Sequence, residues 1–360
     1  MKRVKWGILG LAVFALLLTG GTACKKKGGA ADTGKLIALL PSGAQVVMGF
    51  DFHRFAQLPV YDKITAEKPD HPAGDKLFDD PEEFRQKTGI DLKKDVNTFV
   101  VGMYGLPDRN SPDWAAVASV NYDPAKVEKT LAEKKENLTT ETYGGKTVYL
   151  IKEKAQPADA LGQVKPPEEV AMVLLNPATI VLASPARIHA VIDLAQGKGS
   201  SMAADATLKK HLAGVKQDGL FWLVMGQLPD SMKKKPAAGG MFSPDLSRAE
   251  ALVGSVDFQN ATLSGEFRLI CPDENANKQL ESMLNGLKGM GAMLSAKEPD
   301  LGELLNKITI TASAADLKLT FALPEALLNR LGEKAKNKAS SIMTTAPAAP
   351  AETVAETPAN

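Results

Sequence analysis

The sequence predicts an α+β fold made of two related halves of antiparallel sheet, with helices packed on one face. Apolar and polar residues alternate with a period of two over residues 46–53 and 263–271, as in half-buried strands. Prolines after pairs of strands mark helix starts, because proline suits the first helical position. The same order of strands, proline-led helix, hairpin and proline-led helix occurs on both sides of residues 197–205. Units of this kind favour helices layered on an antiparallel sheet.

The first half is expected at residues 35–196. In order, it comprises a strand at 46–52, a helix over 55–64, a helix over 81–88, strands at 97–104 and 114–121, a helix from Pro124, hairpins at 139–151 and 170–183, and a helix from Pro185. Asp123 caps the helix that Pro124 begins. Gly144 and Gly145 fit the positive φ angles of a tight hairpin turn.

The second half is expected at residues 206–338. Its elements are a strand at 220–227, strands at 251–258 and 263–271, a long helix from Pro272, a hairpin at 308–323 and a helix from Pro324. Pro272 corresponds to Pro124 in this scheme, and Pro324 corresponds to Pro185. Apolar residues on one stripe of the long helix predict that it lies flat on the sheet. Glycines at 286, 289 and 291 predict fraying towards its end.

The first 24 residues form an export signal. Three basic residues, Lys2, Arg3 and Lys5, precede an apolar run over residues 8–18, and small residues lead to Cys24. The run is shorter than the roughly 20 residues of a membrane-spanning helix. The end of the segment resembles the lipobox of bacterial lipoproteins. That resemblance implies removal of residues 1–23 and a diacylglycerol and a fatty acid such as palmitate on Cys24; the alternative is cleavage after Ala23 without lipid.

The resemblance also implies where the chain operates. Residues 24–34 would be a lipidated flexible tether, and the lipid on Cys24 would make the membrane a partner. Because no aspartate follows Cys24, the signal resembles that of lipoproteins sorted to the outer membrane of a diderm bacterium. The protein would then face the periplasm. Residues 342–360 are rich in Ala, Pro and Thr and are predicted to be disordered. The body resembles envelope lipoproteins in general, but it carries no motif of a particular family.

Composition and cysteine content exclude several classes. Hydrophobic residues make up 44% of the chain, as in a globular protein. The leader holds three of the 43 basic residues, which leaves 40 against 42 acidic ones and argues against a nucleic-acid partner. With Cys24 lipidated, Cys271 has no disulfide partner in the chain, and an all-cysteine metal site is excluded. We expect Cys271 to be a small buried hydrophobe.

No motif predicts catalysis, a cofactor or a metal. Residues 144–147, GGKT, lack the earlier glycine of a phosphate-binding loop, since Thr140 stands there. Asp51 and His53 share the polar face of their expected strand. With the loop residues Asp70, His71, Asp79 and Asp80 they would make an oxygen and nitrogen metal site, but a solvated strand end is the simpler explanation because no spacing fixes the approach of these residues. His189 and His211 lie at expected helix positions without ligand spacing.

The sequence therefore predicts a membrane-anchored, non-enzymatic envelope protein with a binding or scaffolding role and Cys24 as its one assigned site. Its further partner would be an envelope protein or an apolar ligand, with the oligomeric state open. One alternative is an exported hydrolase or metal-dependent enzyme, and another is a carrier of a lipid or other apolar ligand. The basic run 233–235 is a solvated loop or a contact with an anionic partner.

Overall fold

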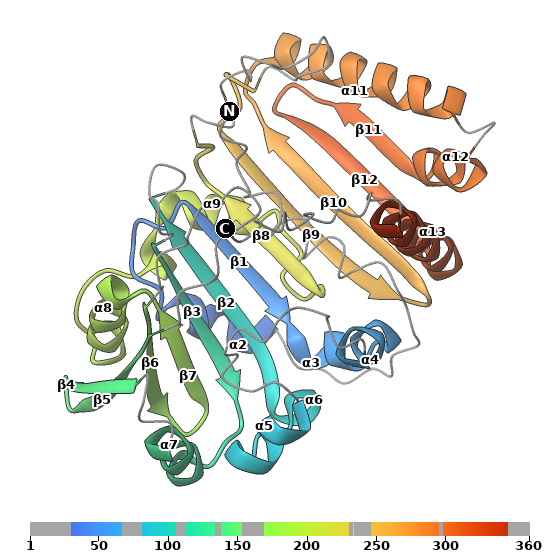
Figure 1. The fold of residues 1–360 in the computed structure, drawn as a ribbon. Helices are drawn as coiled ribbons and strands as arrows, with labels where there is room; N and C mark the ends of the chain where they lie inside the picture. The colour runs from blue at the N-terminus through green and yellow to red at the C-terminus, as the bar shows by residue number, and fades with distance from the viewer. Residues whose placement is uncertain are drawn as a thin grey trace, which may run out of the picture.

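The computed structural model describes residues 30–66, 81–105, 113–133, 138–152, 169–229, 233, 246–294 and 298–344. Within these ranges, twelve strands form one continuous antiparallel sheet, and helices pack against it (Figure 1). The predicted α+β class and the antiparallel pairing are confirmed. None of the described helices is both long enough and apolar enough to cross a membrane.

The bounds of the elements follow the predicted ones closely. The strands are β1 (Val46–Asp51), β2 (Val96–Tyr104), β3 (Asp113–Val120), β4 (Leu138–Tyr143), β5 (Lys146–Lys152), β6 (Glu169–Asn176), β7 (Thr179–Ala183), β8 (Phe221–Met225), β9 (Ala251–Gln259), β10 (Thr262–Ile270), β11 (Ile308–Ala312) and β12 (Asp316–Pro324). The helices are α2 (Ala30–Ile37), α3 (Phe52–Ala56), α4 (Pro59–Ala66), α5 (Pro81–Thr88), α6 (Leu92–Asp95), α7 (Pro124–Glu133), α8 (Pro185–Ala195), α9 (Ala206–Leu212), α11 (Glu274–Leu294), α12 (Pro299–Asn306) and α13 (Glu325–Thr344), with a 3₁₀ turn, η2 (Met202–Ala204). Four short helices, α2, α6, α9 and α12, were not predicted, because each is too short to show a clear helical period.

The two halves meet in the middle of the sheet. The strand order is β11-β12-β10-β9-β8-β1-β2-β3-β7-β6-β5-β4. Outward from the central β1–β8 pair, β1, β2 and β3 match β8, β9 and β10. A hairpin follows in each half, and its second strand pairs with the preceding strands: β7 pairs with β3, and β12 pairs with β10. The first half adds the hairpin β4–β5 at its edge. This mirrored order is the one expected of two related halves.

The four prolines lie at equivalent points of the two halves. Pro124 begins α7 after β3, and Pro272 lies two residues before α11 after β10. Pro185 begins α8 after β7, and Pro324 ends β12 just before α13. The pairing of prolines predicted from the sequence therefore holds at the level of topology.

One rung of cross-strand partners shows how the first face of the sheet, here face A, changes along its width. The rung crosses every strand in the order Glu141, Val148, Val173, Val181, Val117, Val100, Gly49, Trp222, Ser255, Glu266, Thr320 and Thr309. From Val148 to Trp222 each side chain is at most 1% exposed. From Ser255 onward the rung is polar. Along this rung, face A is therefore a core surface over β5, β6, β7, β3, β2, β1 and β8. It is a polar surface over β9, β10, β12 and β11.

The opposite face, face B, is apolar in both halves. Phe50, Phe221, Val256 and Phe321 occupy neighbouring positions of one rung there, with Gly265 between the last two. They pack with Leu327 and Leu328 of α13 and with α3 and α4 in one cluster. A second cluster packs Val127 and Leu131 of α7 against face B of the first half.

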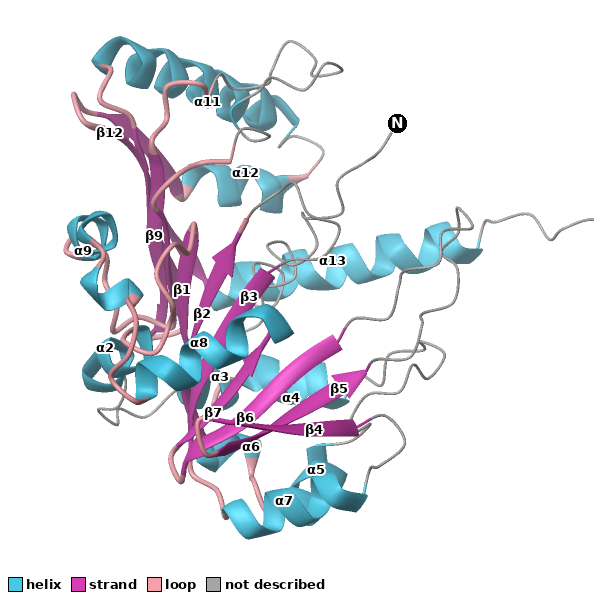
Figure 2. Cartoon of the chain, turned by 90° about the vertical axis from the view of Figure 1, so that its left-hand side faces the viewer, coloured by secondary structure: helices cyan, strands magenta, loops and turns pink. Residues whose placement is uncertain are grey.

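Helices cover both faces, which corrects the prediction that they lie on one. Ile188, Val191 and Ile192 of α8 join the face A valines in the same core cluster, together with α2 and α9. Viewed along the sheet, α2 and α9 lie on one side and α11, α12 and α13 on the other (Figure 2). The physical reason is the composition of β6 and β7, which are apolar on both faces and need cover on both.

Two predicted boundaries also change. Helix α2 begins at Ala30, so the fold starts inside the tether predicted at 24–34; Thr33 is already 1% exposed. Helix α13 continues to Thr344, past the predicted start of the tail at 342. Residues 1–29 and 345–360 lie outside the described residues.

Helix α11 packs on the sheet as its stripe predicts. Leu280 is 5% exposed and contacts the β11–β12 hairpin with Met283 and Leu284. The expected fraying at 289–291 is not found, because the helix continues to Leu294. The buried stripe ends earlier than predicted, since Met290, which the stripe includes, is 41% exposed.

The central strand pair depends on a missing side chain. Gly49 of β1 lies opposite Trp222 of β8, and a Cβ built on Gly49 would lie 2.3 Å from the indole ring. Trp222 is 1% exposed, so the indole occupies the space above this glycine and fills the junction of the two halves.

We expect Gly49→Ala to destabilise the protein by about 1–3 kcal/mol, because overpacking of a closed core forces neighbouring atoms to move. Chemical denaturation followed by tryptophan fluorescence and circular dichroism measures the change. Gly286→Ala is the control: Gly286 is exposed on α11 with no atom within 4 Å of the added Cβ, and it should gain up to about 1 kcal/mol. Equal stability of the two variants would contradict this account of the junction.

Candidate functional site

The polar part of face A is the candidate site. We call it the open face and define it by polar side chains that β9, β10, β12 and β11 direct to face A: Ser255, Asp257, Ser264, Glu266, Arg268, Lys318, Thr320, Thr309 and Thr311. In the first half α8 covers the equivalent surface, whereas α13 lies on face B. The open face therefore results from the different placement of the two equivalent helices.

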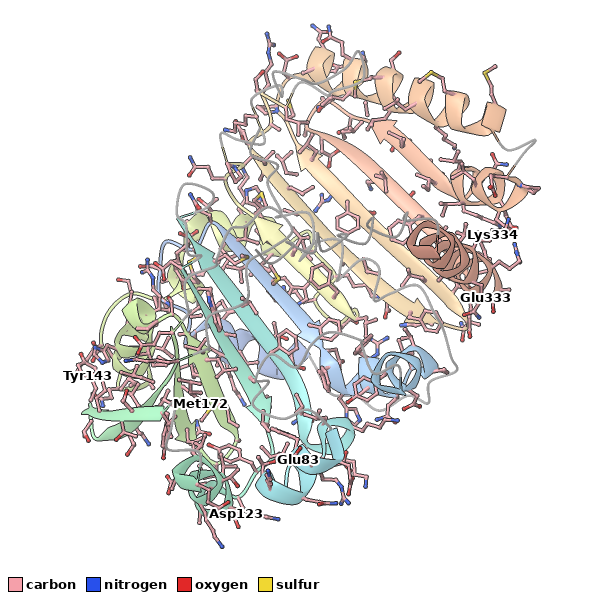
Figure 3. The ribbon with its side chains drawn as sticks, viewed as in Figure 1. Glu83, Asp123, Tyr143, Met172, Glu333 and Lys334 are labelled. Atoms are coloured by element: carbon pink, nitrogen blue, oxygen red, sulfur yellow. The ribbon has the colours of Figure 1, made fainter. Side chains whose placement is uncertain are left out.

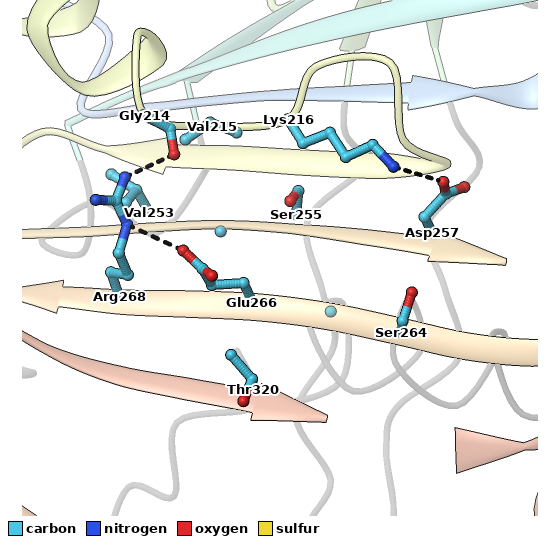
Figure 4. A pocket seen from close by; sticks show the side chains of 12 residues that line it. Gly214, Val215, Lys216, Val253, Ser255, Asp257, Ser264, Glu266, Arg268 and Thr320 are labelled. Carbon is cyan, nitrogen blue, oxygen red and sulfur yellow. Dashed lines mark hydrogen bonds and ion pairs between the residues drawn. The ribbon is translucent and has the colours of Figure 1, made fainter. Parts of the chain in front are cut away.

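A shallow depression of about 320 Å³ lies on the open face. Its floor is formed by β9 and β10, and one wall is the turn over residues 213–219 that joins α9 to β8 (Figure 4). Lys216 and Arg268 lie at its two ends, and Ser255, Ser264 and Thr320 supply hydroxyl groups between them. These groups can bind polar or anionic atoms by hydrogen bonds and charge.

Asp257 is the buried acid of this surface and holds two cations. The Arg54 guanidinium donates to Asp257 Oδ1 at 2.5 Å, and Lys216 Nζ donates to Oδ2 at 3.1 Å. Burial favours the neutral acid, but the hydrogen bonds and charges of Arg54 and Lys216 outweigh it and hold the pKa of Asp257 below its ordinary value. Because Arg54 lies on α3 and Asp257 on β9, this network joins the two halves.

Arg268 fixes the wall of the depression. Its guanidinium donates to the Gly214 carbonyl oxygen at 2.6 Å and lies 3.5 Å from Glu266 and 3.7 Å from Asp316. A Cβ on Gly214 would lie 2.1 Å from that guanidinium, so a larger residue there would displace the end of the Arg268 side chain. Glu266 also lies 3.5 Å from Lys318. The acids of the open face are therefore held in ion pairs.

Helix α9 stands beside the depression and presents cations. Asp205 caps its first turn by accepting from the Leu208 N–H at 2.7 Å, and Leu208 is buried. Lys209 and Lys210 follow on the exposed side. Burial lowers the pKa of His211, and the nearby charges of Lys210 and Arg268 lower it further against the effect of Glu250. The helix and the open face thus form one polar surface.

A second depression, of about 490 Å³, lies where the halves meet, beside residues 43–47. Its lining includes Val47, Met202, Leu208 and Val224, but each of these is at most 3% exposed. The apolar side chains are thus already covered by protein atoms. This depression therefore presents little apolar surface to a ligand.

Asp51 and His53, two of the residues of the predicted metal site, do not share one strand. β1 ends at Asp51, which caps α3 by accepting from the Arg54 N–H at 2.9 Å, so His53 lies on a helix and not on the strand. Aspartate is a strong helix cap, and it ends the strand earlier than the alternation predicts. Burial raises the pKa of Asp51, opposed by Arg54. Asp70, His71, Asp79 and Asp80 lie outside the described residues.

His189 makes structural contacts and belongs to no group of possible metal ligands among the described residues. His189 Nε2 lies 2.6 Å from Glu141 Oε1, and its ring stacks on Tyr143 at 3.9 Å. Tyr143 belongs to the β4–β5 hairpin beside α8 (Figure 3). These contacts hold the hairpin against that helix. Among the described residues, no group of three or more His, Cys, Asp or Glu is arranged to hold a metal ion.

The remaining sequence candidates are structural where they are described. Gly144 and Gly145 form the turn between β4 and β5 with φ angles of 56° and 71°, as predicted for a hairpin. Cys271 is 1% exposed, and burial raises the pKa of its thiol. In the run 233–235 only Lys233 is described, and its N–H donates to the Pro229 carbonyl oxygen. Cys24 lies outside the described residues.

Sequence reasoning identified Ser264, Glu266 and Arg268 as the polar side of a strand but did not single out a surface. It missed Lys209, Lys210 and Lys216 because α9 itself was not predicted. The sequence did contain a signal for this helix: Asp205 is a typical helix cap, and Lys209 and Lys210 follow it near the end of a short helix.

The sequence matches no family model and no curated protein sequence. Solved structures with a similar arrangement are crystal forms III, I and IV of TP0453. They share 9%, 10% and 9% sequence identity with this chain, with TM-scores of 0.47, 0.46 and 0.44. The alignments cover 82–84% of this chain and 96–99% of TP0453. Similarity at this level carries no argument about function.

We expect Asp257→Asn to lower stability at pH 7 by about 1–3 kcal/mol, because Arg54 and Lys216 lose a charged partner. The depressed pKa of Asp257 contributes stability above the pKa of an unfolded aspartate, about 3.9, and that stability is lost as pH falls through the lower folded value. Urea denaturation at pH 7 and pH 3 should therefore show a difference between wild type and variant that shrinks in acid. An undiminished difference at pH 3 would rule out the linkage.

Proposed function

We propose that this protein is an exported, membrane-anchored envelope lipoprotein with a binding or scaffolding role. The observation that carries the proposal is the leader: a basic start, a short apolar run and small residues that end at Cys24. The lipid would be attached to the Cys24 sulfur after removal of residues 1–23. In a diderm bacterium the body would face the periplasm from the outer membrane.

The start of the fold supports close attachment to the membrane. Helix α2 begins six residues after Cys24, and Leu36, Ile37 and Leu40 fix it in the core of face A. Six fully extended residues span at most about 21 Å. A lipid on Cys24 would therefore hold the body beside the bilayer and would limit how far it can turn away.

The open face supports a binding role in preference to catalysis. Its acids, Asp257 and Glu266, each lie within 4 Å of a cation and take part in ion pairs. A catalytic acid or base needs an accessible group with a pKa near the working pH. The surface instead offers hydroxyl groups and fixed charges on rigid strands, which suits recognition of a polar surface.

We expect metabolic labelling with a fatty acid to mark the wild-type chain and to disappear in Cys24→Ser, because the thioether-linked lipid requires the Cys24 sulfur. Cys271→Ser is the matched control, since Cys271 is the other cysteine of the chain and is buried. That variant should keep the label and should stay in the membrane fraction. Persistence of the label in Cys24→Ser would overturn the lipoprotein proposal.

A further inference from the structure

We infer that the surface formed by α9 and the open face is turned towards the bilayer and contacts the anionic headgroups of its lipids. This inference rests on the proposed lipid anchor at Cys24 and names the partner of the binding surface described above. Three independent features support it: the place where the anchor joins the fold, the exposed lysines of α9, and the polar character of the sheet beside them.

The anchor joins the fold on face A, the side that carries α9. Helix α2 lies on face A against β2 and β3 and is eight residues, or about 12 Å, long. The chain after it is fixed to the region before α9, since the Met202 N–H donates to Leu40 and the Ser42 N–H donates to Ser200. Twelve strands at a spacing of about 4.8 Å make the sheet roughly 53 Å wide. A tether of at most about 21 Å therefore favours face A as the side that meets the bilayer.

Helix α9 presents its cations on this side. Lys209 and Lys210 are exposed, and neither has an ion pair with any described residue. The acid of the same helix start, Asp205, is engaged as the cap. Lysines near a membrane surface are attracted by anionic headgroups, and the attraction decays within a Debye length. The unpaired lysine pair is thus suited to contact such headgroups.

The surroundings of α9 are polar rather than apolar. Lys216 and Arg268 flank the depression, and hydroxyl groups lie between them, so phosphate and glycerol oxygens can be bound without burial of apolar surface. Asp218 and Glu250 are also exposed near the turn and oppose the attraction in part. We therefore expect contact with headgroups at the surface, dependent on charge and on salt.

The test uses the full mature chain, lipidated at Cys24 and reconstituted into vesicles. Ala213→Cys places a thiol on the exposed turn after α9, where a fluorophore can be attached because Cys24 is blocked and Cys271 is buried. A quencher attached to lipid headgroups then reports how close α9 lies to the membrane. The vesicles contain phosphatidylglycerol with phosphatidylethanolamine, or phosphatidylcholine alone.

We expect strong quenching on the anionic vesicles and at least about a threefold loss of it in Lys209→Glu/Lys210→Glu. The neutral variant Lys209→Gln/Lys210→Gln should give an intermediate loss, and raised salt should weaken quenching of the wild type. Lys126→Glu/Lys129→Glu on α7, which packs against face B, is the matched control and should quench like the wild type. Circular dichroism of all variants verifies that the fold is kept.

Several outcomes would overturn the inference. Equal quenching after charge reversal on α9 is one, and strong quenching of a fluorophore at Met293→Cys, on α11 over face B, with none at position 213 is another. Shielding of position 213 in native envelopes but not in vesicles of the same lipids would show that a protein covers the surface instead. Absence of fatty acid on Cys24 would refute the proposed function itself, and fatty-acid analysis of the purified chain distinguishes the two failures.

Discussion

The pairing of β1 with β8 is the contact on which the rest of the structure depends. Each is the first strand of its half, and each would expose a row of unpaired backbone groups if the halves separated. Their register, from Val46 opposite Met225 to Phe50 opposite Phe221, joins the halves into one sheet. Gly49 makes room for the Trp222 indole at this junction, so face A continues without a gap from one half into the other. The network of Arg54, Asp257 and Lys216 ties the halves a second time.

The two halves differ in what they do with equivalent elements. In the first half, valines on face A are covered by α8, which begins at Pro185. In the second half, the corresponding helix α13 packs on face B, where Phe321 and Leu323 contact it. Face A is then exposed to solvent, and serine, threonine and charged residues replace the valines. An antiparallel sheet tolerates a solvated face because its backbone groups are satisfied within the sheet.

This asymmetry connects the fold with the proposed role. A symmetric pair of halves would have buried both faces and left only loops and helices as surfaces. The uncovered half instead provides a rigid polar surface whose charges are held in place by their partners, as Arg268 is by Gly214 and Glu266. The N-terminal helix α2 packs on the same side of the sheet and lies only a few residues from Cys24. The proposed anchor and the polar surface would therefore lie on one side of the molecule.

The sequence by itself determined the local structure, and the proposed export signal also rests on it alone. The period-two alternation located strands such as β9 and β10, and the prolines at 124, 185, 272 and 324 marked where helices follow them. These features depend on neighbouring residues, so a single sequence can show them. The alternation around Glu266 likewise showed that one face of the second half is polar. The continuous apolar runs of β6 and β7 indicated that these strands are covered on both faces.

Only the tertiary structure decided which face each helix covers. α8 and α13 follow equivalent strands, yet they pack on opposite faces because their partners, Val181 in one case and Phe321 in the other, point to opposite sides of the sheet. The same holds for the candidate site. Asp51 and His53 are two residues apart, but the strand ends at Asp51 and His53 lies in the helix that Asp51 caps, so the strand alternation does not apply to His53. Lys216 and Asp257 are 41 residues apart and are joined by an ion pair, since strand pairing, which no local pattern encodes, brings them together.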